Sequence, residues 1–330
     1  MVEIEPLSAA CWERIANLLA SHPYKPYMAY VREFGEPAIT NHFLEAVRGR
    51  LDAAGTSSLF ASQSDGVAGF ALWSVAPQES HAFGFQTARL EYLVARGGYA
   101  AQREIKRHLV AHVLERCLAG GIRHISLRVA AADAAAIHAL EEQGFIMVDG
   151  LITYARRLGD EPVPSPSPSF QVRLATPADL PQIMDLARSA FSLDRLHIDP
   201  AVPKAAADEI HGIWLAGSCS PGSPDRVLVA VDAEGALGYS VYRIDRSTVR
   251  HLGEPLGVWV IAAAHERARG MGVAMSMCLV MLQWYKEQGI RIVEGGTQLA
   301  NVASARLHES CGFHVASTSV SLSKWIGGPR

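Results

Sequence analysis

The sequence predicts an α/β protein made of two successive domains that repeat one order of strands and helices. Three observations support this prediction. The 330 residues exceed the usual size of one domain. A segment rich in proline and serine, "GDEPVPSPSPS" at 159–169, has a composition typical of a linker. The two halves also match each other when the chain is shifted along itself by 168 positions.

The internal match extends over several short segments in one register. The segment "GGIRH" at 120–124 aligns with "QGIRI" at 288–292, Asp133 aligns with Asn301, and "GF" at 144–145 aligns with "GF" at 312–313. Single matches of this kind occur by chance, but several in one register indicate a duplicated fold. We therefore expect a first domain at 1–158, a linker at 159–169 and a second domain at 170–330.

The first half begins with a short strand in "VEIEP", a helix in "SAACWERIANLLA" and a hairpin in "SLFASQSDGVAGFALW". The second half repeats this order with "FQVRLA" and then a helix that starts at Thr176 as N-cap, with Pro177 at its first position and Asp179 in its first turn. A hairpin through "DAEG", an apolar strand "GVWVIAAA" and a long helix "AMSMCLVMLQWYKEQ" follow. A strand in "GIRIVEGGTQ" and a helix capped by Asn301 complete the pattern.

Composition excludes several classes of protein. Thirty Lys and Arg against 33 Asp and Glu give a formal net charge of −3, which favours neither nucleic acid nor an anionic membrane as partner. The N-terminus lacks a signal peptide and no apolar run has the length of a membrane span, so we expect a cytoplasmic protein. Five cysteines without C-x-x-C spacing argue against disulfides and zinc, and the pair His108 and His112 lacks a third ligand. We expect no metal.

The turn "HERARGMGVA" at 265–274 joins the apolar strand to the long helix. A helix start exposes backbone N–H groups at the positive end of the helix dipole, and glycines let a phosphate approach them closely. Arg267 and Arg269 add positive charge. The turn therefore predicts a pyrophosphate site, whereas the motifs of P-loop and Rossmann dinucleotide sites are absent from the sequence.

The combination of strand, R-x-x-G-x-G, helix, strand and N-x-x-[small]-x-x-x-[polar]-x-x-x-G-F resembles the GCN5-related N-acetyltransferase (GNAT) superfamily over most of 170–325. The first half resembles the same fold in a degenerate form, because Gln102 and Glu104 align with Gly270 and Gly272. The resemblance implies two tandem GNAT-like domains, each with a mixed, mostly antiparallel central sheet flanked by helices. It also implies acetyl-CoA as co-substrate, with no metal.

The resemblance assigns roles to particular positions. The coenzyme residues that it implies are Val260, Ile261, Arg267, Arg269, Gly270, Met271, Gly272, Val273 and Asn301. A backbone N–H near Val260 would polarise the thioester carbonyl. His308 stands where the family often has the tyrosine that protonates the departing thiolate, and the alternatives are water or the acceptor amine. Candidates for a general base are Glu254, His265 and Glu294.

The segments "F-x-x-D-R-x-H-x-D-P" from Phe191 and "T-Q-x-x-N" from Thr297 resemble the branch that acetylates nucleotide-linked amino sugars, of the TDP-fucosamine acetyltransferase type. This branch implies acceptor contacts from Arg195, His197, Asp199 and Gln298. Arg195 and Asp199 have an alternative role as a local salt bridge.

The expected function is an acetyl-CoA-dependent N-acetyltransferase, an acyltransferase that acts on a primary amine of a small molecule. Two alternatives stay open. The first is a binding protein that senses acyl-CoA or a metabolite without turnover. The second is an enzyme for protein, peptide or antibiotic amines. The degenerate first half has three candidate roles: scaffold, part of the acceptor cleft, or the surface of a homodimer.

Overall fold

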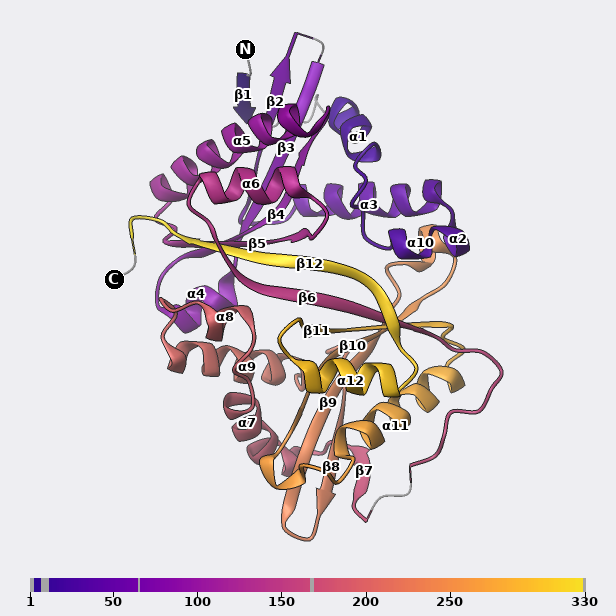
Figure 1. Ribbon diagram of the computed structural model, residues 1–330. Coiled ribbons are helices and arrows are strands. Elements are labelled where there is room, and N and C mark those ends of the chain that lie inside the picture. Colours follow the sequence, from indigo (N-terminus) through magenta and orange to yellow (C-terminus); the bar gives the residue numbers. More distant parts are fainter. Residues whose placement is uncertain (1–2, 7–11, 65, 167–168, 329–330) are drawn as a thin grey trace. The chain divides into compact units, whose positions relative to one another are not determined.

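The computed structural model describes residues 3–6, 12–64, 66–166 and 169–328. The chain forms two compact units (Figure 1). The first consists of Met1–Gly150 with Ser319–Arg330, and the second of Leu151–Thr318.

The first unit is built on a mixed, mostly antiparallel sheet in the order β1-β2-β3-β4-β5-β12. Only β4 and β5 run parallel among the paired strands described within this unit. Its strands are β1 (Glu3–Pro6), β2 (Thr56–Gln63), β3 (Gly66–Val75), β4 (Thr87–Ala95), β5 (His124–Ala130) and β12 (His314–Trp325). Its helices are α1 (Trp12–Ala20), η2 (Met28–Tyr30), α2 (Val31–Phe34), α3 (Glu36–Leu51), α4 (Pro77–Phe83), α5 (Tyr99–Ala119) and α6 (Ala134–Glu142).

The second unit repeats this architecture with the strand order β7-β8-β9-β10-β11-β6. Its parallel pair is β10 and β11, and its other strand pairs among the described residues are antiparallel. Its strands are β6 (Ile146–Arg157), β7 (Gln171–Leu174), β8 (Arg226–Asp232), β9 (Gly235–Asp245), β10 (Leu256–Ala264) and β11 (Ile292–Gln298). Its helices are η3 (Pro177–Asp179), α7 (Leu180–Ser189), α8 (Arg195–Ile198), α9 (Lys204–Ser218), α10 (Val249–Leu252), η4 (Glu266–Ala268), α11 (Val273–Glu287) and α12 (Val302–Ser310).

Each sheet buries apolar side chains on both of its faces. In the second unit, Val229 packs with α7 and α9, whereas its neighbour Leu228 packs with α11. In the first unit, Ala71 packs with α5 and α6, whereas Leu72 packs with α1 and α3. Successive residues of a strand point to opposite faces. The predicted fold, two tandem α/β domains with helices flanking mixed sheets, is therefore confirmed.

The last strand of each half completes the sheet of the other unit. Residues 151–157 of β6 pair with β11, and residues 319–325 of β12 pair with β5. The predicted boundaries at 158 and 170 follow chain order, so they differ from the two compact units in these two strands. The alternation of a strand predicts that it pairs, but it does not specify which sheet edge it joins.

Local signals for helix starts are confirmed. Thr176 is the N-cap as predicted, and its backbone N–H and hydroxyl both donate to Asp179 Oδ2 at 2.7 Å, at the start of a first turn of 3₁₀ type. Asn301 caps α12, since its side-chain oxygen accepts from the Ser304 N–H at 3.1 Å.

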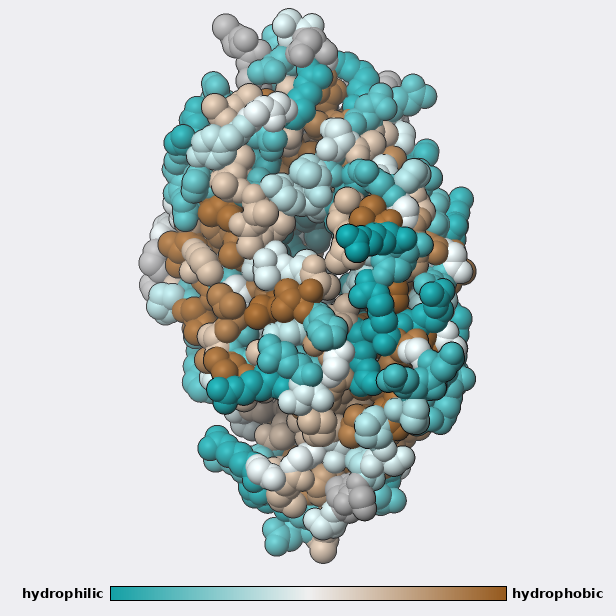
Figure 2. All heavy atoms as spheres, turned by 45° about the vertical axis from the view of Figure 1, so that its right-hand side comes forward, coloured by the Kyte–Doolittle hydropathy of each residue, from teal (hydrophilic) through white to brown (hydrophobic). Residues whose placement is uncertain are grey.

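No helix among the described residues has both the length and the hydropathy that a membrane span requires. Figure 2 shows hydrophilic side chains over much of the face in view, with smaller hydrophobic areas among them.

Candidate active site

Strands β10 and β11 separate halfway along their length. Their parallel pairing covers Gly257–Trp259 with Val293–Gly295 and ends there, although both strands continue. At the same point the register between β10 and β9 shifts, which leaves Val260 as a β-bulge. Val260 is 39% exposed. Beyond Trp259, the edge of β10 that faced β11 therefore offers backbone N–H and C=O groups without a strand partner among the described residues.

The glycine turn follows directly where β10 ends at Ala264. Gly270 and Gly272 adopt φ values of 76° and 74°, a left-handed conformation that favours glycine. A Cβ at either position would meet no atom within 4 Å, so the requirement is conformational and the space above the turn is open. Gly272 is the N-cap of α11, and no acidic residue lies in the first turn of that helix.

Backbone donors point out of this turn. The first N–H groups of a helix have no intrahelical acceptor. The first backbone hydrogen bond of α11 runs from the Ser276 N–H to the Gly272 carbonyl. In the described part of the chain, the N–H groups of Gly272, Val273 and Ala274 make no backbone hydrogen bond. Together with the helix dipole they form a positive surface that suits an anion.

The two arginines of the turn are in different environments. Arg267 binds both carboxylate oxygens of Asp232, at 2.6 and 2.9 Å, and the Gly235 carbonyl at 3.2 Å. This ion pair ties the turn to the β8–β9 hairpin. The Arg269 side chain is 82% exposed, with Glu266 at 3.6 Å. The geometry thus offers Arg269 to an anion, whereas the predicted coenzyme contact of Arg267 stays a prediction.

His308 lies in an aromatic cluster beside the point where the strands separate. Its ring stacks on Tyr154 at 4.8 Å and lies 4.8 Å from the ring of Trp259. Its Nδ1–H donates to the Ser304 carbonyl at 2.8 Å. The Nε2 atom faces Gly295, 3.0 Å from where a Cβ would stand, and it has no hydrogen-bond partner in the structure as described.

Burial lowers the pKa of His308. The residue is only 3% exposed, and the hydrogen bond to Ser304, which raises the pKa, is the smaller influence. A neutral ring with its proton on Nδ1 presents a lone pair at Nε2. The predicted role of His308 as an acid stays a prediction, and these surroundings favour the neutral form.

Comparison with known proteins identifies this arrangement. Residues 181–313 match the model of the acetyltransferase (GNAT) family. The second half of the chain is thus similar to the GNAT family. The match covers β8–β11, the glycine turn and α12, which are the elements that build the site.

Two curated relatives agree with this assignment. SpsD of Bacillus subtilis, a spore coat polysaccharide biosynthesis protein, is 26% identical over 192 residues, which cover 57% of this chain and 62% of SpsD. The chain thus spans less than two thirds of that relative. The dTDP-fucosamine acetyltransferase of Escherichia coli O6:H1 is 24% identical over 196 residues, which cover 59% of this chain and 79% of that enzyme.

Solved structures confirm the tandem GNAT fold along the whole chain. A GCN5-related N-acetyltransferase from Sphaerobacter thermophilus covers 100% of this chain with a TM-score of 0.65 and 18% identity; 97% of that chain is matched. A tandem GNAT protein from the clavulanic acid biosynthesis pathway aligns over 100% of both chains, with a TM-score of 0.57 and 16% identity.

The first GNAT-like unit lacks the glycine turn. Strand β4 ends at Ala95 and α5 begins at Tyr99, so residues 99–104 are helical where the second unit has its loop. Gln102 donates to the Gly97 carbonyl at 2.7 Å and the Tyr99 hydroxyl contacts His138 at 2.7 Å. These contacts tie the residues that align with the glycine turn to their own unit.

A buried ion pair is the second difference in the first unit. Lys106, with its side chain fully buried, contacts both oxygens of Asp133 at 2.7 and 2.8 Å. Asp133 caps α6, as Asn301 caps α12 in the second unit. The Lys–Asp pair therefore stands where the second unit presents a neutral amide, that of Asn301.

The candidate bases have structural contacts. The Nδ1 atom of His265 accepts from the Arg267 N–H at 3.2 Å and so caps η4. Glu254 lies 3.4 Å from Arg291. Glu294 lies in the paired part of β11, opposite Val258. These positions do not assign the general base.

The predicted acceptor residues belong to a more tightly packed region than the sequence indicated. Asp199 is 2% exposed and accepts from the Ala201 N–H at 3.0 Å. His197 contacts Asp194 and Asp208 through its two ring nitrogens. Gln298 is half-buried at the end of β11, where its carbonyl accepts from the Asn301 N–H. The four predicted contacts stay predictions.

Three residues of this region, Asp194, Asp208 and His211, are not among the site residues predicted from the sequence. They form two D-x-x-H pairs, Asp194 with His197 and Asp208 with His211. Residues three apart on a helix are neighbours, so this spacing was the available signal.

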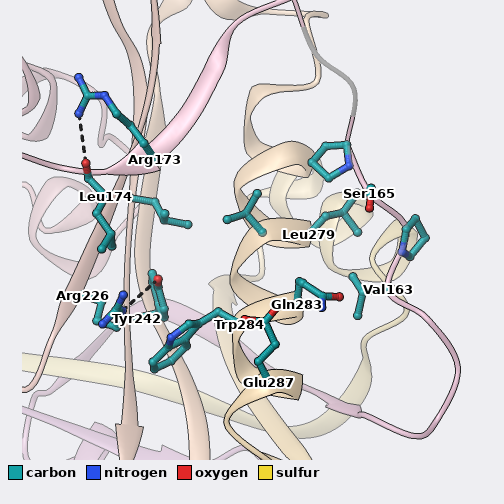
Figure 3. A pocket seen from close by; sticks show the side chains of 14 residues that line it. Val163, Ser165, Arg173, Leu174, Arg226, Tyr242, Leu279, Gln283, Trp284 and Glu287 are labelled. Carbon is teal, nitrogen blue, oxygen red and sulfur yellow. Dashed lines mark hydrogen bonds between the residues drawn. The ribbon is translucent and has the colours of Figure 1, made fainter.

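A separate pocket of about 400 Å³ lies between α11, strands β7–β9 and the Pro-rich segment at 163–166. Figure 3 shows Arg226 beside Trp284 and Tyr242 at its wall. The Arg226 guanidinium lies 4.7 Å from the Trp284 ring centroid, and its Nε lies 3.4 Å from the Tyr242 hydroxyl oxygen. None of its lining residues belongs to the glycine turn or to β10.

Proposed function

We propose that this protein is an acetyl-CoA-dependent N-acetyltransferase that acts on a primary amine of a small molecule. The main observation in support is that the edge of β10 beyond Trp259, which has no strand partner among the described residues, leads directly into the glycine turn, whose N–H groups at 272–274 make no backbone hydrogen bond. A single extended ligand with amides at one end and a pyrophosphate at the other fits that sequence of groups. Acetyl-CoA has this form.

Different groups of the site would bind different parts of the coenzyme. The N–H groups of Gly272, Val273 and Ala274, with the exposed Arg269, would hold the pyrophosphate. The edge of β10 from Val260 to Ala264 would hold the pantetheine amides, as a strand edge pairs with an added strand. The side-chain nitrogen of Asn301 would be available to donate to the coenzyme, because only its oxygen caps α12.

Reaction requires alignment and a hydrogen-bond donor at the carbonyl. The neutral acceptor amine forms a C–N bond with the thioester carbon while the C–S bond breaks, and the proton lost by nitrogen balances the proton gained by sulfur. The bulge at Val260 would aim a backbone N–H at the thioester oxygen, which stabilises the charge that develops there.

We propose a nucleotide-linked amino sugar as the acceptor. Support comes from the dTDP-fucosamine acetyltransferase among the relatives and from the half-buried amide of Gln298 at the end of β11, beyond the point where the strands separate. A side-chain amide both donates and accepts, which suits a sugar hydroxyl.

The test follows free thiol release from acetyl-CoA with four acceptor panels: amino sugars, nucleotide-linked amino sugars, polyamines and peptides. We expect turnover with nucleotide-linked amino sugars. Turnover with peptides alone would support the protein acetyltransferase alternative. Tight acetyl-CoA binding without turnover on any panel would support a sensor and contradict the enzyme proposal.

A variant of His308 tests how the thiolate is protonated. Because its pKa is lowered, His308 loses its proton as pH rises through a value below the ordinary 6.5, and it is neutral at pH 7 to 8. We therefore expect His308→Gln to keep kcat within about 10-fold of the unmodified protein, with the same pH profile between pH 6 and 8.

The matched control is His314→Gln, at an exposed histidine that follows α12. A kcat loss of about 10²-fold or more in His308→Gln alone, with a changed alkaline limb and unchanged thermal unfolding, would instead establish His308 as the acid.

A further inference from the structure

Three side chains in the second unit converge on one point that the proposed reaction does not use. Asp194 Oδ2 lies 2.5 Å from His197 Nδ1 and 3.2 Å from His211 Nε2. The three atoms all lie within 4.8 Å of one another. Asp194 caps α8, His197 lies in α8 and His211 lies in α9, so the cluster joins two helices.

The hydrogen bond at the second ring nitrogen of His197 is characteristic of a histidine that binds a metal ion. Its Nε2 atom lies 3.0 Å from Asp208 Oδ1, so that nitrogen donates its proton to a carboxylate. A histidine that binds metal through one nitrogen commonly donates the other N–H to a carboxylate, which fixes the tautomer and the ring orientation. In the neutral ring, the proton on Nε2 leaves a lone pair on Nδ1, directed at the oxygen of Asp194.

His211 also has features of a metal ligand, for a different reason. Its ring is 3% exposed, and its Nδ1 atom has no hydrogen-bond partner in the described portion of the chain. The Phe191 ring stacks on it at 4.1 Å and holds its orientation. With the proton on Nδ1, the lone pair on Nε2 also points at Asp194 Oδ2. Two lone pairs and a carboxylate oxygen then face one another, and a cation would satisfy all three.

We propose that Asp194, His197 and His211 bind a divalent transition-metal ion of the zinc type. Two imidazoles and a carboxylate are ligands that Zn²⁺ favours, and a three-ligand set leaves the fourth position to water. Ligand atoms of a tetrahedral zinc ion lie about 3.3 Å apart, from bonds of about 2.0 Å. The contact of Asp194 with His211 has this separation, and the contact with His197 needs to open by under about 1 Å.

The proposed ion would connect the segments 194–198 and 204–211, the first of which includes two of the predicted acceptor residues, Arg195 and His197. It stands apart from the cysteines and from the pair His108 and His112, on which the expectation of no metal was based. The site does not depend on acetyl transfer, so it is tested by binding alone.

The experiment uses the untagged full chain, freed of metal with a chelator and then titrated with Co²⁺ and Zn²⁺ at pH 7. We expect one ion per chain, the visible absorption of four-coordinate Co²⁺, and loss of that absorption when Zn²⁺ is added. Metal-free protein that binds neither ion stoichiometrically would overturn the proposal, and the cluster would then be a network of imidazolium and carboxylate groups.

Variants locate the ion. His211→Gln and Asp194→Asn are each expected to weaken Zn²⁺ binding by 10²-fold or more, as about 1.4 kcal/mol corresponds to each tenfold change. Asp208→Asn, whose side chain is 23% exposed, is expected to weaken it by about 10- to 100-fold.

Asp208→Asn keeps the test decisive if the buried variants fail to fold. The control is His314→Gln, at an exposed histidine outside the cluster, and it should bind the ion as the unmodified chain does. Equal affinity in the control, Asp208→Asn and the unmodified protein would place the ion elsewhere and contradict the assignment.

Discussion

Replacement of Gly270 by glutamate is expected to lower the affinity for acetyl-CoA by about 10²-fold or more, equivalent to about 3 kcal/mol. Gly270 has a φ of 76°, which a residue with a side chain adopts at a cost, and the space above the turn is the space that the proposed pyrophosphate fills. A carboxylate placed there would also repel the negatively charged pyrophosphate that the N–H groups of Gly272 and Val273 are proposed to hold. Isothermal titration calorimetry measures the loss.

The same helix supplies the matched control. Gly289 follows the C-terminal end of α11, with a φ of 72° and no atom within 4 Å of its Cβ position. Gly289→Glu therefore imposes the same backbone conformation and the same charge at the opposite end of α11, and should bind acetyl-CoA normally. Equal losses in the two variants would trace the effect to folding, and two equal coenzyme sites in the unmodified chain would contradict the assignment to the second unit.

Replacement of Lys106 by methionine is expected to destabilise the first unit by about 3–5 kcal/mol. The change removes the cation and leaves Asp133 buried without its partner, since the Asp133 side chain is only 6% exposed. Denaturant unfolding, followed by a probe in the first unit, measures the change in the free energy of unfolding. Acetyl-CoA binding by the second unit should remain when the protein is folded.

A double variant separates the ion pair from its surroundings. Lys106→Met with Asp133→Asn removes both charges and keeps an N-cap side chain on α6, as Asn301 provides on α12. We expect it to recover most of the lost stability. The control is Arg103→Met, which breaks an exposed ion pair to Glu142 between the same two helices and should cost about 1 kcal/mol or less. A single-variant loss no larger than that of Arg103→Met would show that the buried pair is not required.

The features predicted correctly from the sequence are those encoded by adjacent residues. Thr176 and Asn301 bond to groups three positions away, and the glycine turn follows its strand directly, so their spacing is visible in the chain. The conformation of Gly270 and Gly272 follows from glycine itself. In the first unit, residues 99–104 form the start of α5 in place of such a turn.

The features that the sequence did not predict depend on distant partners. The ion pair of Arg267 with Asp232, 35 positions away, was not predicted. The stacking of Tyr154, on a strand that precedes the linker, against the His308 ring was likewise not predicted. The pairing of Asp194 with His211 likewise needs the fold that brings α8 to α9. Spacing alone does not specify such contacts.

Because β6 and β12 each complete the sheet of the other unit, the two sheets obtain their last strands at different times during translation. The first unit, whose helices and inner strands are synthesised first, obtains its strand β12 only from residues 319–325, near the end of the printed sequence. The second unit has its strand β6 made in advance, before the linker and before any other strand of its own sheet. During translation the earlier unit therefore waits with an open edge on β5, while the later unit can close as soon as β11 emerges.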